Sequence, residues 1–154
     1  MPSNSFSSTP SGSAVEFTLT DRPIHIVDDE KMIREFVKMH LMVDGFENIE
    51  TAENGAVALE EVKTFNPDLI ILDMKMPVLD GFGVLKALRS ETETEDLPVL
   101  VTSALSTHEG RNAILRYGAS NLMSKPIDAE IMLRRCRDML KRHLLIQELA
   151  RYRL

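Results

Sequence analysis

The chain has 154 residues, a single cysteine at position 136 and a formal net charge of −6. This length suits one domain with appendages, and one cysteine excludes an intrachain disulfide framework. No apolar run approaches the roughly 20 residues that cross a bilayer, and the N-terminus lacks a signal-peptide pattern. We therefore expect a soluble protein of the reducing cytoplasm, without membrane contacts.

The charge is unevenly distributed along the chain. Residues 128–154 contain seven Lys/Arg and four Asp/Glu, a local charge of +3, so the remainder carries −9. An acidic domain is a poor partner for nucleic acid, and we expect no direct contact with it. A cation or a basic protein surface is the expected partner of the acidic part.

Composition divides the chain into three parts. Residues 1–20 are rich in Ser, Thr, Pro and Gly, which predicts a disordered leader without a function of its own. Residues 21–144 form the predicted domain. Residues 145–154 are predicted to extend its last helix as a linker or a partner-binding segment.

Short apolar runs alternate with amphipathic segments from Pro23 onward. The runs predict strands at 24–27, 48–51, 68–72, 98–103 and 121–124. Helical spacing predicts helices over 32–43, 55–64, 81–89, 107–117 and from about 128, with Asn54 as a cap. Five such units predict an α/β fold, a doubly wound five-stranded parallel sheet covered by helices on both faces.

Polar residues stand where the predicted strands end. Asp28 and Asp29 follow the first strand, Asp73 follows the third, Ser103 ends the fourth and Lys125 follows the fifth. In a parallel sheet these ends share one edge, and ligands bind there. We therefore expect the five side chains to form one site.

Three carboxylates in one crevice repel one another and favour a neutralising cation. Oxygen ligands without histidine or thiolate indicate Mg²⁺ rather than zinc. A carboxylate beside Mg²⁺, with a hydroxyl and an ammonium nearby, suits phosphoryl transfer with Asp73 as the nucleophile. Each acid taken alone is interpreted as a loop residue or a helix cap, but the whole set at the strand ends favours a phosphoryl-transfer site.

Four motifs carry a resemblance to a known family. They are "VDDE" at 27–30, "DMKMPVLDG" at 73–81, "PVLVTSA" at 98–104 and "SKP" at 124–126. In this order and spacing the chain resembles the receiver domain of response regulators from two-component signalling, over about residues 24–144. The resemblance implies the (βα)5 flavodoxin-like fold of the chemotaxis response regulators, here with an extended C-terminal helix.

The resemblance also implies a role for each matching acid. Asp73 would be the phosphoacceptor and, with Asp29, a direct Mg²⁺ ligand. Asp28 would hold the metal mainly through water, and the backbone carbonyl of Lys75 would complete the protein ligands. Lys75 and Leu105 occupy variable positions that tune how fast the phosphoryl group is lost.

Other matching residues would bind the phosphoryl group and transmit its presence. Ser103 would donate a hydrogen bond to a phosphoryl oxygen, and Lys125 would pair with the group. Pro126 is expected to follow a cis peptide bond that directs the lysine. The family's aromatic switch position holds Leu122 instead, so the usual rotation of an aromatic ring is not expected here.

The implied partners follow from the same resemblance. A sensor histidine kinase or a histidine phosphotransfer protein would supply the phosphoryl group. Phosphorylation would then switch the face of the fourth helix, fifth strand and last helix, and regulate an output partner or a C-terminal effector domain. Such a domain loses the phosphoryl group by itself, but it is a signalling switch rather than an enzyme.

Three alternatives remain at this point. A haloacid-dehalogenase-like phosphohydrolase also uses an Asp nucleophile, but it needs a second Asp where Lys75 stands. A nucleotide-binding domain needs glycine where "DDEKM" follows the first strand. A pseudo-receiver that binds partners without phosphorylation conflicts with the complete set of site residues, although Leu122 favours it.

The last helix carries two apolar stripes on nearly opposite sides. The second stripe, after Leu144, has the spacing of a coiled-coil seam, and its alternative is a frayed helix end. It predicts a helix that leads to a partner, a homodimer mate or an effector domain outside these residues. The first stripe is Met132, Leu133, Cys136, Met139, Leu140 and Leu144, and the second is Leu145, Leu149 and Tyr152.

Overall fold

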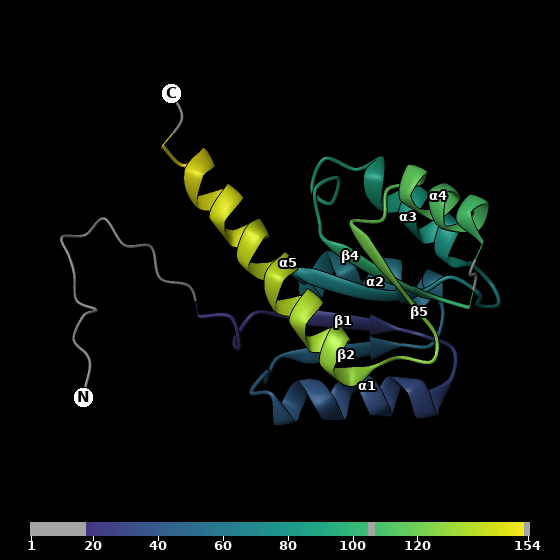
Figure 1. Cartoon of the computed structure of the whole chain (residues 1–154). Coiled ribbons are helices and arrows are strands. Elements are labelled where there is room, and N and C mark those ends of the chain that lie inside the picture. The colour runs from purple at the N-terminus through teal and green to yellow at the C-terminus, as the bar shows by residue number, and fades with distance from the viewer. Residues whose placement is uncertain (1–17, 105–106, 153–154) are drawn as a thin grey trace.

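A five-stranded parallel sheet with the order β2-β1-β3-β4-β5 forms the centre of the molecule (Figure 1). The computed structural model describes residues 18–104 and 107–152. The chain leaves β1 toward one edge and returns at β3 toward the other, so a topological switch point lies between β1 and β3. The strands are β1 (Ile24–Val27), β2 (Ile49–Ala52), β3 (Leu69–Asp73), β4 (Val99–Ser103) and β5 (Asn121–Ser124).

Each strand is followed by a helix, and four of the five helices begin with a side-chain cap. The capping side chain accepts a hydrogen bond from the backbone N–H three residues later, which satisfies a donor of the first turn. The caps are Asn54, Asp80, Thr107 and Asp128. The helices are α1 (Lys31–Val43), α2 (Gly55–Phe65), α3 (Gly81–Arg89), α4 (His108–Arg116) and α5 (Ala129–Ala150).

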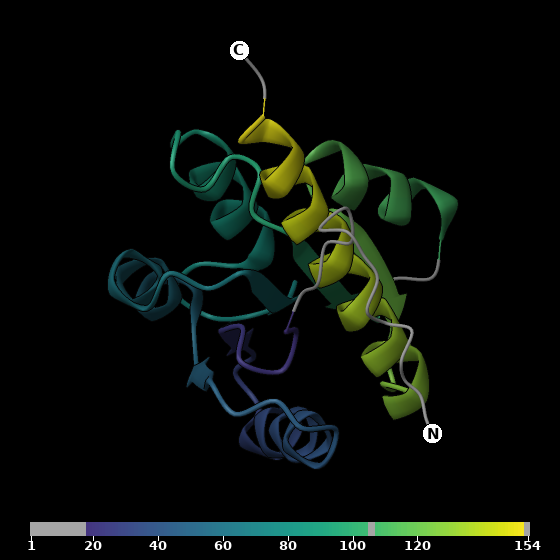
Figure 2. The ribbon, with the colours of Figure 1, turned by 90° about the vertical axis from the view of Figure 1, so that its left-hand side faces the viewer.

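The strands bury side chains on both faces of the sheet. Helices α1 and α5 cover one face, where Ile24 and Ile26 of β1 lie. Helices α2, α3 and α4 contribute to the core on the other face, with Ile70 and Leu72 of β3. Figure 2 shows α1 and α2 nearly end-on and the helices arranged around the sheet. The predicted doubly wound parallel sheet is confirmed.

The third strand extends one residue further than predicted. Asp73 is its last residue and pairs with Thr102 of β4, whereas the apolar run alone ended the predicted strand at Leu72. The backbone of Asp73 is therefore held by its pairing with β4, one residue beyond the last pair of β3 with β1. This fixes the position from which its side chain leaves the sheet.

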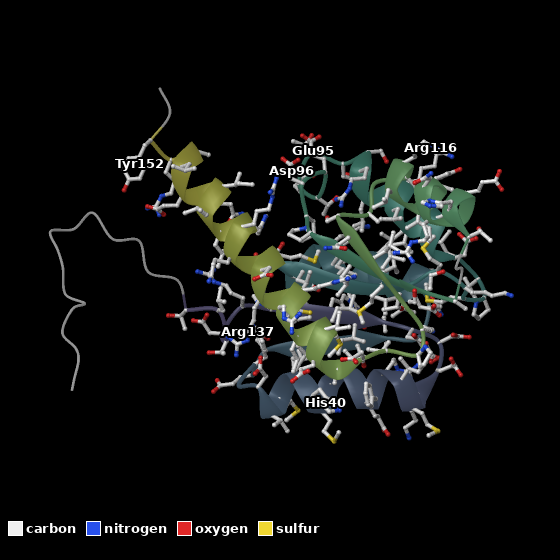
Figure 3. All side chains as sticks on the ribbon, in the orientation of Figure 1. His40, Glu95, Asp96, Arg116, Arg137 and Tyr152 are labelled. Carbon is white, nitrogen blue, oxygen red and sulfur yellow. The ribbon has the colours of Figure 1, made fainter. Side chains whose placement is uncertain are left out.

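Helix α5 has a docked part and a projecting part. The predicted first stripe packs on the sheet, and Arg137 adds an ion pair of 2.8 Å with Asp44 at the end of α1. After Leu144 the helix continues to Ala150 and carries Tyr152 away from the sheet (Figure 3). No helix within residues 18–104 and 107–152 is long and apolar enough to span a membrane.

Most of the predicted leader, residues 1–17, lies outside the described residues, as does Leu105. The last leader residues belong to the folded domain. Leu19 packs against the core beside α1 and α5, and the Thr20 carbonyl accepts a hydrogen bond of 3.2 Å from the Glu47 N–H.

Candidate functional site

Three carboxylates meet at the switch point of the sheet. Asp28 and Asp29 follow β1, and Asp73 ends the adjacent β3. One carboxylate oxygen from each lies within 4.8 Å of the others. Asp28 and Asp73 are buried, with 2% and 4% of their surface exposed, whereas Asp29 is exposed. The structure thus brings together the three acids predicted to hold a cation.

Lys125 reaches into this cluster from β5. Its Nζ lies 3.1 Å from Asp73 Oδ1 and 3.2 Å from Asp28 Oδ2, and Glu30 stands at 4.0 Å. The backbone N–H of Lys125 donates to the Ser103 carbonyl at 2.9 Å, and the bond between Lys125 and Pro126 is cis. The expected cis geometry is therefore present, and one ammonium is shared by two buried carboxylates.

Burial sets the electrostatics of this pair. Burial raises the pKa of Asp73, and the neighbouring Asp28 carboxylate raises it further. Lys125 and a backbone hydrogen bond from Lys75 act in the opposite direction without cancelling the shift. Burial alone would lower the pKa of Lys125, but its bonds to Asp73 and Asp28 outweigh burial and raise it. The Asp73 carboxyl is thus less acidic than an exposed aspartate.

Local backbone contacts hold Asp28 in place. Its Oδ1 accepts a hydrogen bond of 2.9 Å from the Glu30 N–H, and its carbonyl accepts one of 2.8 Å from Arg34. Sequence analysis missed the role of Arg34. The only signal was its position one turn after Glu30, on the side of α1 that faces the site.

The start of α3 packs directly on the strand that carries Asp73. A Cβ added at Gly81 would lie 2.7 Å from the Met74 Cα and 2.9 Å from the Asp73 carbonyl oxygen, so this position requires glycine. The Gly81 N–H donates to the Met74 carbonyl at 2.9 Å. Asp80 caps α3 and lies outside the acidic cluster, as expected for turn chemistry.

The loop between Asp73 and α3 contains a strained residue that the sequence did not predict. The Leu79 N–H donates to the Pro77 carbonyl at 2.8 Å, and Val78 between them has a φ of 70°. A three-residue turn with a positive φ is rare, and a β-branched side chain makes it costly. Val78 is also exposed. The loop that carries Lys75 therefore stores strain beside the site.

Ser103 and Leu122 lie on neighbouring strands behind Lys125. Ser103 is buried at the carboxyl end of β4, next to the shared edge. Leu122 is buried in the core on the α2 and α3 face, and its carbonyl accepts a hydrogen bond from Arg135 of α5. Leu122 therefore belongs to the core, and its role at the switch position stays a prediction.

The donor set fits a hard cation. Asp28, Asp29 and Asp73 supply oxygen atoms only, and they form the only cluster of three or more metal-ligating His, Cys, Asp or Glu found among residues 18–104 and 107–152. Mg²⁺ prefers one or two carboxylates together with water and phosphate oxygens. Receiver domains generally bind Mg²⁺ through such acids, and the residues present match that chemistry.

Comparison with known proteins agrees with this arrangement. Residues 24–137 match the response regulator receiver domain family. The response regulator MprA of Mycobacterium ulcerans (strain Agy99) is 39% identical over 119 residues, which are 77% of this chain and 50% of that protein. MprA of Mycobacterium avium (strain 104) is 38% identical, over 77% of this chain and 51% of that protein. The chain spans about half the length of these relatives.

Solved structures give the same result. The receiver domain of the Francisella response regulator 1452 superposes with a TM-score of 0.74 at 31% identity, covering 79% of this chain and 98% of that one. The Vibrio cholerae chemotaxis protein CheY4 gives 0.72 at 29% identity, covering 77% and 98%. The chain belongs to the response regulator receiver domain family.

Proposed function

We propose that Asp73 accepts a phosphoryl group from a phosphohistidine of a sensor histidine kinase or a histidine phosphotransfer protein, in a step that depends on Mg²⁺. The observation that carries this proposal is the convergence of Asp28, Asp73 and Lys125, where the Lys125 ammonium lies within 3.2 Å of one oxygen of each carboxylate. Membership of the receiver family supports the same role.

In the proposed step, an Asp73 carboxylate oxygen forms a bond to phosphorus while the bond between phosphorus and the donor imidazole nitrogen breaks. The electron pair stays with the imidazole, which is protonated as it leaves. Such transfers depend on positioning and on charge neutralisation. Pairing of β3 with β1 and β4 holds Asp73 in position, and Lys125 neutralises charge beside it.

Mg²⁺ would be held by Asp28, Asp29, Asp73 and the Lys75 carbonyl, and when bound it would offset the negative charge of the phosphoryl oxygens. Asp73 must be ionised to attack.

Helix α1 offers a surface for the phosphodonor. Four exposed or part-exposed apolar residues follow one another at 4-3-4 spacing along it: Met32, Phe36, Met39 and Val43. This spacing suits contact with another helix. The stripe begins directly beside the acidic rim, because α1 starts at Lys31. A helical donor that covers the stripe would bring its histidine to the site.

The output is proposed to run through the α4-β5-α5 face and the projecting end of α5. Leu145, Leu149 and Tyr152 are exposed on α5 with seam spacing, which supports self-association or contact with an effector. Sedimentation over a concentration series, with and without a phosphoryl mimic, tests self-association. A monomer throughout, unchanged by truncation after Leu144, would contradict it.

The phosphoacceptor proposal is tested with a small-molecule phosphodonor such as acetyl phosphate, with and without Mg²⁺. We expect Mg²⁺-dependent labelling of the wild type and none of Asp73→Asn. Asp80→Asn is the matched control, because it alters an acid in the same loop and asparagine caps a helix as well as aspartate does. Absence of labelling in the wild type would favour the pseudo-receiver alternative.

A further inference from the structure

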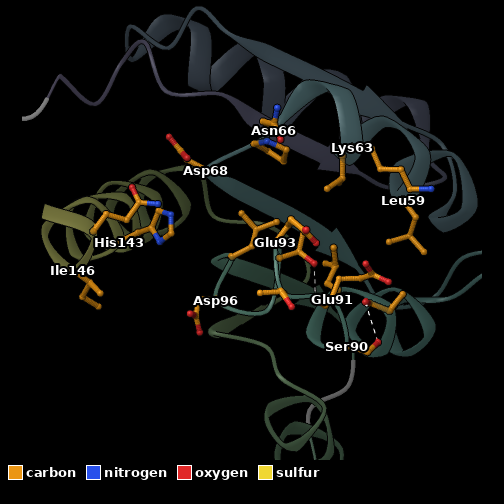
Figure 4. Close-up of a pocket in the computed structure, with 18 of the residues that line it drawn as sticks. Leu59, Lys63, Asn66, Asp68, Ser90, Glu91, Glu93, Asp96, His143 and Ile146 are labelled. Carbon is orange, nitrogen blue, oxygen red and sulfur yellow. Dashed lines mark hydrogen bonds between the residues drawn. The ribbon is translucent and has the colours of Figure 1, made fainter. Parts of the chain in front are cut away.

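A hollow of about 1270 Å³ lies at the amino end of the sheet, opposite the acidic cluster. It is bounded by the end of α2, the loop 90–97 after α3 and the last turns of α5. Figure 4 shows His143 and Ile146 of α5 on one side and Leu59 and Lys63 of α2 on another. A second hollow of about 600 Å³ shares His143, Ile146 and Asp96 with the first. The last turns of α5 therefore border a hollow on each of two sides.

Aliphatic side chains form part of the lining of the larger hollow. Leu59 and Val62 come from α2, Leu88 ends the apolar face of α3, and Leu97 precedes β4. Ile146 of α5 completes this surface and is 53% exposed. Val62, Leu88 and Leu97 are buried in the core, so Leu59 and Ile146 supply the apolar surface that an occupant could cover.

The rim of the hollow is acidic. The loop "SETETED" at 90–96 contains four carboxylates, of which Glu91, Glu93 and Asp96 line the hollow. None of these four takes part in an ion pair among residues 18–104 and 107–152. Asp96 interacts electrostatically with Arg89 and His143, and the charges of Glu91 and Glu93 are available to a ligand that brings positive charge.

The remaining carboxylates of the lining are already paired. Glu60 lies 3.2 Å from Lys63, and Asp68 lies 3.6 Å from Arg22. Positive charge on an occupant would therefore be attracted to the loop side of the hollow rather than to α2.

The acidic loop is held in a fixed shape. Arg89 donates to the Thr94 carbonyl at 2.9 Å and to the Gly118 carbonyl at 3.0 Å. The Thr94 hydroxyl donates to the Leu88 carbonyl at 2.6 Å. A loop fastened at its middle presents its carboxylates in a defined arrangement, which lowers the entropy lost on binding.

The end of α5 has no support on its inner side. Ile146, Gln147 and Ala150 face the hollow instead of packing on the body. A helical segment of about ten residues is marginally stable without tertiary contacts. An occupant of the hollow would therefore stabilise the last turns of α5.

We propose that this hollow is the docking site for a basic amphipathic helix of a partner protein. The apolar face of that helix would contact Leu59 and Ile146, and its Lys or Arg side chains would meet Glu91, Glu93 and Asp96. Helices bind to such grooves through apolar anchors one turn apart. Complementary charge would add orientation and a faster association.

Two segments of this chain fit the acidic rim less well. Residues 1–17 of this chain contain no Lys or Arg. The α5 end of a second copy offers Glu148 and Arg151, which already bind each other at 2.9 Å. Nucleic acid would be repelled by the acidic rim. A partner helix with an excess of Lys and Arg is the chemistry that fits.

The test uses the full chain and a synthetic amphipathic peptide of about 14 residues, with leucine on one face and lysine on the other. We expect saturable binding by calorimetry, weakened by salt, and no binding of the same peptide with glutamate in place of lysine. Hydrogen exchange should slow at amides 146–150 when the peptide binds. Failure of the lysine peptide to bind would overturn the proposal.

Matched variants separate the groove from general charge. Glu91→Gln/Glu93→Gln/Asp96→Asn should weaken binding about tenfold, whereas neutralising the exposed Glu47, Glu109 and Glu130 should not. Equal weakening by the two triple variants would overturn the proposal.

The apolar part of the lining has its own pair of variants. Ile146→Ser should weaken binding, whereas Leu115→Ser on α4, which is 45% exposed, should not. Equal weakening of peptide binding by Ile146→Ser and Leu115→Ser would contradict docking in the hollow. Binding should persist in Asp73→Asn without Mg²⁺, because the inference rests on the fold and not on phosphorylation.

Discussion

At the carboxyl end of the sheet, Asp28 and Asp73 are buried and share the ammonium of Lys125, whereas at the amino end Glu91, Glu93 and Asp96 line an open hollow. In the described part of the chain these three have no ion pair. Burial and the shared ammonium alter the pKa values of Asp73 and Lys125, which suits the proposed phosphoryl transfer. Exposed carboxylates on a fixed loop keep ordinary solvation, which suits recognition. The same residue type thus stands in different environments at the two ends, and we propose a different role for each.

Removing a lysine at each end gives the largest expected contrast. Lys125→Ala leaves two buried carboxylates without their counter-ion, and we expect it to lower the free energy of unfolding by about 2–3 kcal/mol at neutral pH. Lys63→Ala removes an exposed ion pair with Glu60 and should change the free energy of unfolding by less than about 0.5 kcal/mol. Urea unfolding measures both, and equal losses would contradict the contrast.

Lys125→Ala also separates labelling from switching. The nucleophile and the metal ligands remain, so labelling by acetyl phosphate should be slowed but not abolished, while the change in hydrogen exchange over α4, β5 and α5 on phosphorylation should be lost. If labelling and the conformational change fell to the same extent, Lys125 would act in transfer rather than in transmission.

Added Mg²⁺ should stabilise the carboxyl end alone. A ligand at a hundred times its Kd raises the free energy of unfolding by about 2.7 kcal/mol. We expect this gain in the wild type and in Glu91→Gln/Glu93→Gln/Asp96→Asn, because the loop carboxylates form no metal cluster in the described residues. Asp29→Asn should lose most of the stabilisation by Mg²⁺. Thermal unfolding with and without Mg²⁺ measures the effect, and a gain that depended on the loop would contradict the assignment.

The raised pKa of Asp73 predicts a pH-dependent gain from Asp73→Asn without Mg²⁺. The folded state holds the proton of this carboxyl more tightly than the unfolded state does, so ionised Asp73 opposes folding at neutral pH. The variant should be more stable than the wild type at pH 7, and the difference should shrink as pH falls through the folded pKa. Denaturant unfolding between pH 7 and 4 measures it. A variant that is less stable at pH 7 would show that Lys125 outweighs burial.

The smallest expected effect concerns Val78. Glycine adopts a positive φ without steric cost, so Val78→Gly should raise the free energy of unfolding by about 0.5–1 kcal/mol. Val78→Ala retains a Cβ and should raise the free energy of unfolding only slightly. Thermal unfolding of the two variants measures this, and an equal gain from both would indicate that the backbone is not strained.

Sequence alone predicted the carboxyl end well, for a physical reason. Apolar runs located the strands, and parallel topology places their last residues on one edge, so Asp28, Asp73 and Lys125 could be grouped before any coordinates. The extent of β3 was wrong by one residue because Asp73 is polar but still pairs with Thr102.

The amino end was not predicted, because no single segment carries its signal. Leu59, Leu97 and Ile146 come from three distant segments, and each has an ordinary place in an apolar pattern. The sequence of the acidic loop is typical of a solvated turn, and only the structure shows the hydrogen bonds of Arg89 and Thr94 that hold it. The turn at Val78 was also missed, because valine gives no sequence signal for a positive φ.

Mapping the phosphoryl group to a residue tests the central claim most directly. The protein is labelled with acetyl phosphate and Mg²⁺ and treated with borohydride, which reduces an aspartyl phosphate to homoserine, and its peptides are then read by mass spectrometry. We predict homoserine at position 73 alone, and none in Asp73→Asn. Modification at Asp28 or Asp29 in place of Asp73, or no modification in the labelled wild type, would contradict the account.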